Sequence, residues 1–265
     1  MKNLKIFSTK VWLAVTCTFL TLFPSFSASG FKAEAQTEKK SIQNFYNNVI
    51  LLSFHDEPQF ASVFSSDLSA LYGGNGCSVK SYFEKQSNGK LNVTTLIAGG
   101  GEIIFSKHSE NYYKPAYEWI NGYFENGRYE KTNPEGYDNR YYDENGNAVS
   151  PSDETAKPSC ERILREQLLV REAAKAFTEK ESNAFTDGNA DGIADSFVII
   201  TDAGEKNVDW GDLLWSHKSS CLPQNKIIES GAYYWTDELK AQYGDFGYAT
   251  LVSSYLFTYN VISEN

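Results

Sequence analysis

An acidic stretch in the middle of the chain limits most strongly what this sequence can fold into. Asp187, Asn189, Asp191 and Asp195 place three carboxylates and one amide within nine residues, and the apolar run 197–200 follows almost at once. Carboxylates so close together repel one another and make a loop costly to order. A bound divalent cation reverses the sign of that interaction. The stretch therefore predicts a cation-binding loop that leads into a buried strand.

The spacing of these oxygen-bearing residues, D-x-N-x-D-G-x-x-D, favours calcium, which binds carboxylate and carbonyl oxygens. Gly192 permits the sharp turn, but an EF-hand would need a glutamate where this chain has Val198, so we predict a shorter structural calcium loop. The alternative is an Asp- and Gly-rich turn capped by its own side chains. The predicted calcium ligands are four side chains and one backbone carbonyl: Asp187, Asn189, Asp191, Asp195 and, through its carbonyl, Ile193.

The beginning of the chain is typical of a secretory signal. Three lysines precede the apolar run 11–23, which at about 13 residues is too short to span a bilayer. We predict a signal peptide over 1–35 with cleavage after Ala35, or alternatively after Ser29, and a secreted, extracellular protein. A retained anchor is the other interpretation.

Charge and cysteine content restrict the partners of the mature chain. Without residues 1–35, 20 basic residues remain against 33 acidic ones, because that segment holds four of the 24 basic and one of the 34 acidic residues. Such a surface repels nucleic acid and anionic lipid, so neither nucleic acid nor, after signal cleavage, a membrane is expected as a partner. Cys77, Cys160 and Cys221 leave an odd number: either one pair forms, or a thiol has its partner outside this sequence.

Hydrophobic patterns over 36–265 predict one domain of mixed α/β (α+β) class. The expected strands are 49–54, 91–97, 102–105, 196–201 and a last strand-like run at 250–262. A helix begins after Ser78 and stops at Asn88-Gly89, and a longer one follows Ser159 with an apolar face from Cys160 to Phe177.

The region between these elements is rich in aromatic and turn-forming residues. Aromatic residues recur at helical spacing over 112–124, whereas 125–159 lacks a helical period and is predicted to be a surface insertion. Within it, Asn145-Gly146 predicts a hairpin turn over Glu144 to Asn147.

The order of several segments resembles a known family. "NVILLSFHD", "SYFEKQSNGKLNV", the long helix, "FTDGNADGIADSFVIITDAG", "LLWSHK" and "YNVISE" together resemble the M6 family of secreted metallopeptidases, the immune inhibitor A type, over roughly 48–264. The resemblance implies a zinc-dependent metalloendopeptidase acting on protein or peptide substrates. It also implies a zincin-like mixed β-sheet with packed helices.

The zinc chemistry that the resemblance implies needs H-E-x-x-H on a helix. The chain has only His55, His108 and His217, none in such a pair, so no zinc ligand or catalytic residue is assigned. Family members place the zinc helix just after the segment matching "YNVISE", where this sequence ends. We therefore expect a domain truncated at its C-terminus and inactive alone, either a gene fragment or a natural remnant.

Other candidates have simpler interpretations. His217 could contact a substrate or be a satisfied, partly buried side chain, and His55 is expected in a turn because no second histidine lies near it in the sequence. A second group of acids is expected to be a solvated face rather than another cation site: Asp202, Glu205, Asp209 and Asp212. The alternative functions are a non-catalytic, calcium-stabilised secreted domain that binds protein or glycan through its aromatic residues and, less favoured, an acid-pair glycosidase.

Overall fold

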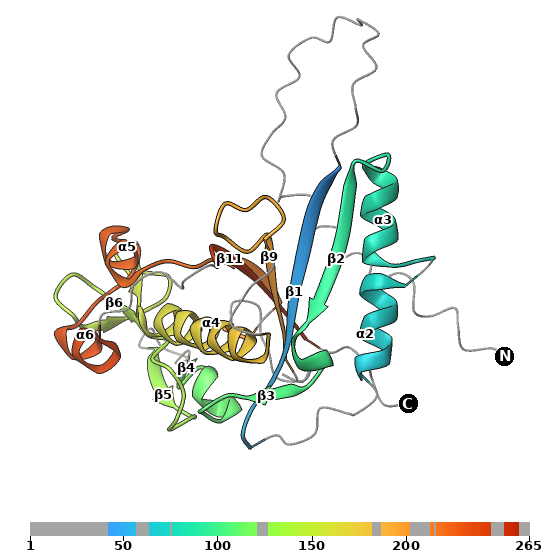
Figure 1. Cartoon of the computed structure of the whole chain (residues 1–265). Coiled ribbons are helices and arrows are strands. Elements are labelled where there is room, and N and C mark those ends of the chain that lie inside the picture. The colour runs from blue at the N-terminus through green and yellow to red at the C-terminus, as the bar shows by residue number, and fades with distance from the viewer. Residues whose placement is uncertain are drawn as a thin grey trace, which may run out of the picture. The chain divides into compact units, whose positions relative to one another are not determined.

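A six-stranded sheet organises the computed structural model, in the order β10-β11-β9-β1-β2, with β3 also pairing with β1 (Figure 1). Neighbouring strands are parallel except β10, which is antiparallel to β11. This arrangement confirms the predicted mixed sheet with packed helices. The strands are β1 (Gln43–Ser53), β2 (Leu91–Ile97), β3 (Ile103–Phe105), β9 (Ser196–Thr201), β10 (His217–Ser220) and β11 (Ser254–Tyr259).

The structure describes part of the chain, and these parts belong to one compact unit spanning 42–260. The described residues are 42–56, 64–74, 76–120, 127–181, 187–201, 213–214, 216–244 and 252–259. The predicted signal peptide 1–35 and the second acidic group, at 202, 205, 209 and 212, lie outside them.

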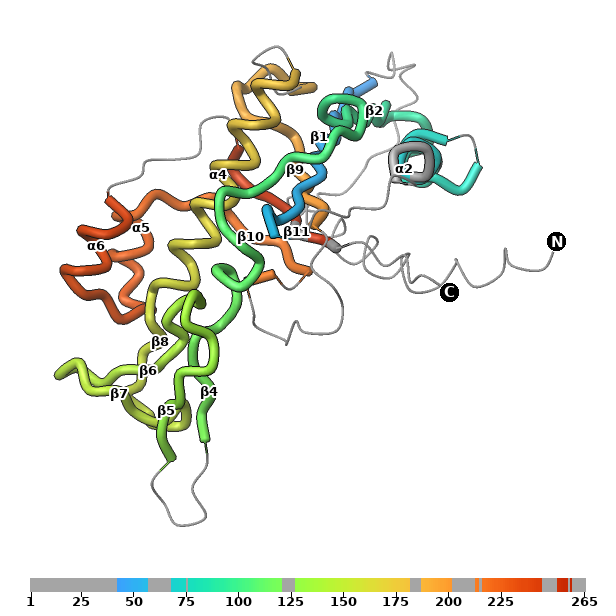
Figure 2. The backbone as a smooth tube through the Cα atoms, turned by 90° about the horizontal axis from the view of Figure 1, so that it is seen from below, coloured from blue at the N-terminus to red at the C-terminus, as the bar shows by residue number. Residues whose placement is uncertain are grey.

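Helices cover the sheet on two sides. Helices α2 (Phe64–Gly73) and α3 (Val79–Gln86) lie between β1 and β2 in the chain, and α4 (Glu161–Lys180) precedes β9. Figure 2 shows α4 on one side of β1 and β9 and α2 on the other. From β1 the chain crosses to β2 on one side and later to β9 on the other. Right-handed crossovers in these two directions place their helices on opposite faces of the sheet. No described helix is long and apolar enough to cross a membrane.

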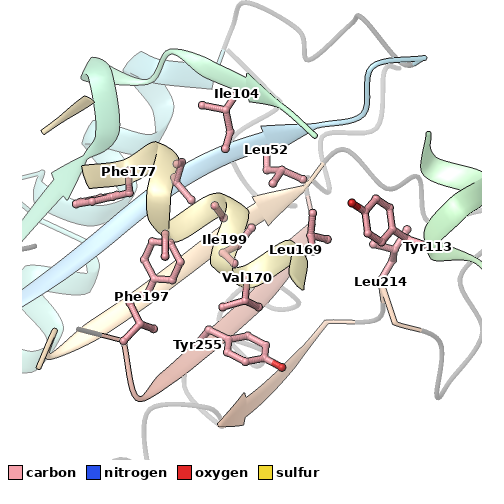
Figure 3. Close-up of a cluster of buried hydrophobic side chains, with 14 of the residues drawn as sticks. Leu52, Ile104, Tyr113, Leu169, Val170, Phe177, Phe197, Ile199, Leu214 and Tyr255 are labelled. Carbon is pink, nitrogen blue, oxygen red and sulfur yellow. The ribbon is translucent and has the colours of Figure 1, made fainter. Parts of the chain in front are cut away.

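The core lies between α4 and the sheet (Figure 3). Every residue of β9 is buried, as expected for a parallel strand covered on both faces. Phe177 of α4 meets Phe197 of β9 edge to face, with ring centroids 5.8 Å apart. Leu169 and Val170 belong to the same cluster. The predicted apolar face of this helix is therefore its packing face.

The helix boundaries follow from capping. Ser78 caps α3 as predicted, with its side chain accepting from the backbone N–H of Ser81, and the positive φ values of Asn88 (53°) and Gly89 (70°) follow the end of the helix. The prediction for α4 was wrong by one residue. Its N-cap is Cys160, although the Ser159 hydroxyl still accepts a hydrogen bond from Glu161 N at 3.3 Å.

The predicted insertion folds into short turns and strands. Its elements are β5 (Arg128–Lys131), β6 (Tyr141–Tyr142), β7 (Ala148–Val149) and β8 (Lys157–Pro158), and η2 (Glu110–Tyr113) and β4 (Tyr117–Ile120) precede it. The hairpin prediction is confirmed: β6 and β7 are antiparallel, and Gly146 has φ 83°. The helical spacing over 112–124 was misleading, because Pro115 forces Lys114 into an extended conformation and the chain continues as β4.

Three further short helices complete the described elements. They are η1 (Ala98–Gly100) between β2 and β3, α5 (Gln224–Glu229) and α6 (Asp237–Tyr243). Ile227 of α5 packs with Ile163 and Leu164 of α4 in a second apolar cluster, which the partly buried Tyr243 of α6 joins.

Candidate functional site

The predicted calcium loop curls around the carboxylate of Asp187. One oxygen of Asp187 accepts from the backbone N–H groups of Asn189 (3.1 Å) and Ala190 (2.8 Å). The other oxygen accepts from Gly192 N at 2.7 Å. Gly192 has φ 85°, as a sharp turn requires, and Ala190 also has a positive φ of 58°. The first acid therefore forms the centre of the turn.

The middle of the loop is held by side chains two residues apart. Asn189 Oδ1 accepts from Asp191 N at 2.9 Å, and its amide nitrogen donates to Asp191 Oδ2 at 2.9 Å. Asp191 Oδ1 accepts from Ile193 N at 2.8 Å. Asp187, Asn189 and Asp191 thus follow one continuous hydrogen-bonded turn.

Asp195 makes a contact outside the loop, with a strand of the sheet. Its Oδ2 accepts from Tyr46 N in β1 at 2.8 Å and from Gly188 N at 2.9 Å. A side chain at position 188 would not fit, because a Cβ there would lie 2.2 Å from the carbonyl oxygen of Asn44. Asp195 and Gly188 therefore fasten the loop to β1.

The oxygen atoms of the loop are of the type that calcium binds, but they do not converge on one point in the structure. The oxygens are carboxylate, amide and carbonyl, which calcium prefers. Among the described residues, however, no three acidic, histidine or cysteine side chains form a group that could hold a metal. Calcium binding would require the oxygens of the loop to converge on one point. The loop precedes β9, at the amino edge of the parallel strands, whereas ligands of open α/β sheets bind beyond the carboxyl ends.

A second polar cluster joins α4 to the edge of the sheet. Glu166 is 1% exposed, and its Oε1 accepts from the Tyr255 hydroxyl and lies 2.7 Å from His217 Nε2. The guanidinium of Arg162 is 3.8 Å from the other oxygen. His217 is therefore a satisfied, half-buried side chain, the simpler of its two interpretations.

The next residue of α4 fixes the same edge. Gln167 Nε2 donates to Ser220 O of β10 at 3.1 Å, and its Oε1 accepts from Leu222 N at 3.0 Å. Because Glu166 and Gln167 are adjacent, one turn of α4 holds β10 at both ends. Neither residue was predicted from the sequence, since the helical period marks apolar positions only.

His55 and His108 follow the carboxyl ends of β1 and β3, two strands that pair with each other. Burial lowers the pKa of His108, and the charges of Arg165, Lys107 and His55 lower it further. His55 itself lies in a turn after β1, as predicted.

The resemblance to M6 metallopeptidases implies a zinc ion, but this chain does not contain the ligands that such an ion needs. The sequence contains three histidines and no H-E-x-x-H. His217 is bonded to Glu166. We therefore derive no step through zinc.

The three cysteines outside the predicted signal are all free thiols in the described structure, so of the two alternatives the pair within this chain is not present. Cys77 is exposed, whereas burial raises the pKa of Cys160 and of Cys221 to about 12 each. The thiols of Cys160 and Cys221 are therefore protonated and poor nucleophiles at neutral pH.

The described aromatic residues from Tyr112 to Tyr142 pack mainly on one another. Trp119 of β4 meets Tyr129 of β5 with centroids 4.7 Å apart, and the Tyr129 hydroxyl donates to Val149 O at 3.0 Å. The Arg140 guanidinium lies over the Tyr117 ring at 4.2 Å. These contacts agree with the packing interpretation of the aromatic residues.

No model of a known protein family matches the chain, and no curated protein sequence matches it. The resemblance to M6 metallopeptidases therefore stays a prediction.

Proposed function

We propose that this chain is the part of a secreted, M6-like metalloendopeptidase that carries the substrate-side sheet and a structural calcium loop. One observation carries the proposal. The segments that suggested the resemblance contribute five strands of a single sheet, although they are scattered over about 200 residues: "NVILLSFHD" lies in β1, "KLNV" in β2, "FVIIT" in β9, "HK" in β10 and "Y" at the end of β11.

The edge strand β10 offers a place for an extended peptide. Among the described strands it pairs only with β11, and it runs antiparallel to it. Extended peptides add to exposed sheet edges through main-chain hydrogen bonds. Glu166 and Gln167 hold β10 on α4, so the edge that a peptide would meet is already ordered. The proposed substrate is accordingly a protein or peptide in extended conformation.

Calcium in this proposal stabilises the protein and takes no part in chemistry. The ion would be held by Asp187, Asn189 and Asp191 with the carbonyl of Ile193, while Asp195 keeps the loop on β1. Calcium near millimolar concentration outside cells fills even the weaker sites of extracellular modules. A loop pinned to β1 and β9 would hold the middle of the sheet in register.

The coding DNA beyond codon 265 tests the enzymatic part of the proposal. An in-frame H-E-x-x-H supports a peptidase, and a genuine stop codon supports the alternative of a calcium-stabilised binding domain. The 265-residue chain alone should show no casein cleavage that a zinc chelator abolishes, because it lacks the motif. Chelator-sensitive cleavage by this chain would overturn the assignment.

A further inference from the structure

Two histidines leave the sheet side by side. Strands β1 and β3 are parallel, with Ser53 opposite Phe105. The pairing continues beyond β3, since Ser106 N donates to Ser53 O at 2.9 Å. His55 follows two residues after Ser53, and His108 follows three residues after Phe105.

Contacts on both sides keep the two turns together. Glu110 N donates to Asp56 Oδ1 at 3.0 Å, so the residue after His55 is bonded to the turn that holds His108. The Phe54 ring lies 5.6 Å from that of Tyr113. His108 stacks on Tyr112 with ring centroids 3.9 Å apart and lies 6.3 Å from the Tyr113 ring. The position of His108 is thus set by two aromatic rings.

Both imidazoles are exposed, so an ion could reach them from solvent. Imidazole nitrogen suits nickel, copper and zinc, whereas calcium requires oxygen ligands. We propose that His55 and His108 form a two-histidine site for a divalent transition-metal ion at the carboxyl edge of the sheet. No third histidine, cysteine or acid among the described residues joins them in a metal-holding group, so water completes the coordination.

The place in the fold supports a ligand site. β1 has β2 and β3 on one side and β9 on the other, so the order of connections reverses at this strand. Ligands of open α/β sheets bind outside the carboxyl ends at such a reversal. His55 stands directly beyond the end of β1. The site is separate from the calcium loop, which precedes β9, and does not depend on the proposed peptidase function.

Titration of the untagged protein with NiCl₂ by isothermal calorimetry, in buffer with excess calcium, tests the site. We expect one nickel ion per chain. His55→Ala and His108→Ala should each weaken binding by more than the roughly tenfold that losing an outer-shell partner of a metal costs. His217→Gln is the matched control and should leave nickel affinity unchanged. Copper should bind more tightly than nickel, and zinc less tightly than copper.

The proposal is overturned if the wild-type protein binds no nickel, or if either alanine variant binds it as tightly as the wild type. Because both side chains are exposed, the variants should keep the wild-type circular dichroism spectrum. A second measurement avoids substitution altogether: nickel should protect His55 and His108, but not His217, from diethyl pyrocarbonate. Equal modification of His55 and His108 with and without nickel would refute the site.

Discussion

The carboxylate of Asp195 accepts a hydrogen bond from the backbone N–H of Tyr46 at 2.8 Å, across 149 residues of sequence. The same oxygen accepts from Gly188 N at 2.9 Å. One side chain therefore joins the first strand of the sheet, the acidic loop and the start of β9. Because this bond joins two parts of the protein itself, the contribution of Asp195 to stability can be measured in EDTA.

Replacing Asp195 by alanine should lower the free energy of unfolding in EDTA by about 1–3 kcal/mol, because two backbone donors lose their acceptor. Urea denaturation followed by fluorescence measures the change. Asp195→Asn keeps an acceptor oxygen and should lose less. Equal losses for both variants would show that hydrogen bonding at this position is not the cause.

Asp191→Ala should change stability only when calcium is present. Its carboxylate is exposed and bonds within the loop, so its removal should change the melting temperature little in EDTA. Calcium at 100 times its dissociation constant stabilises a folded protein by about 2.7 kcal/mol, and a weakened site loses part of this. Differential scanning fluorimetry in both media gives the comparison. The same drop in calcium and in EDTA would refute calcium binding by this loop.

Arg165→Met should destabilise the protein by about 3–5 kcal/mol, because it leaves the buried carboxylate of Glu161 without its cation. The ion pair measures 2.7 Å, and the two side chains are 6% and 9% exposed. Arg165 also donates to the carbonyl oxygens of Tyr112, Glu135 and Gly136. Lys226→Met, in an exposed pair with Glu229, is the control and should cost at most about 1 kcal/mol. Similar losses in chemical denaturation would contradict the role of burial.

Glu172→Gln should raise stability at neutral pH. Burial raises the pKa of Glu172 in the folded protein above its ordinary value of 4.5. The folded state then binds the proton more tightly than the unfolded state, so stability falls as pH rises through the interval between the two pKa values. The advantage of the Glu172→Gln variant over wild type should therefore vanish below about pH 4. Denaturation midpoints from about pH 3.5 to about pH 8 measure it, with exposed Glu154→Gln as the control that should follow the wild type.

Gly146→Ala should destabilise the insertion more than Gly231→Ala. Both glycines have positive φ, 83° and 63°, which costs an alanine about 1–2 kcal/mol. A Cβ at position 146 would also lie 2.5 Å from the Tyr234 hydroxyl, whereas position 231 is open. Displacing Tyr234 would weaken its stacking on Tyr142, whose centroid is 4.6 Å away. Thermal unfolding of the two variants isolates the contact; identical melting temperatures would exclude it.

The sequence predicted correctly those strands that form an apolar run between turn-forming residues. The limits of β2 and β9 match the expected ranges, because apolar runs bounded by turn residues define them. Strand β1 begins at Gln43 rather than at Val49, since its polar first half pairs with β2 through the backbone. Buried Asn48 even donates to Ser196 O at 3.0 Å. The first half of β1 was not predicted as a strand because it is rich in polar residues.

Contacts between distant residues account for most of what the sequence did not reveal about the sites. Spacing pointed to the acids of the loop, but nothing in the sequence shows that Tyr46 N lies opposite Asp195. Likewise, Glu166 stands on a helix 51 residues before His217 and 89 before Tyr255. Register between parallel strands decides the first of these contacts and the packing of α4 on the sheet decides the others, and a single sequence carries no signal for either.

The position of β1 in the middle of the sheet has a consequence for biosynthesis. This strand is among the first parts of the domain to leave the ribosome, yet its partner β9 follows only after about 150 further residues. Contacts so far apart in sequence form slowly, because a long loop must close before they gain any stability. Until then the apolar half of β1 lacks one of its neighbours, so the sheet is completed only after most of the domain has been synthesised.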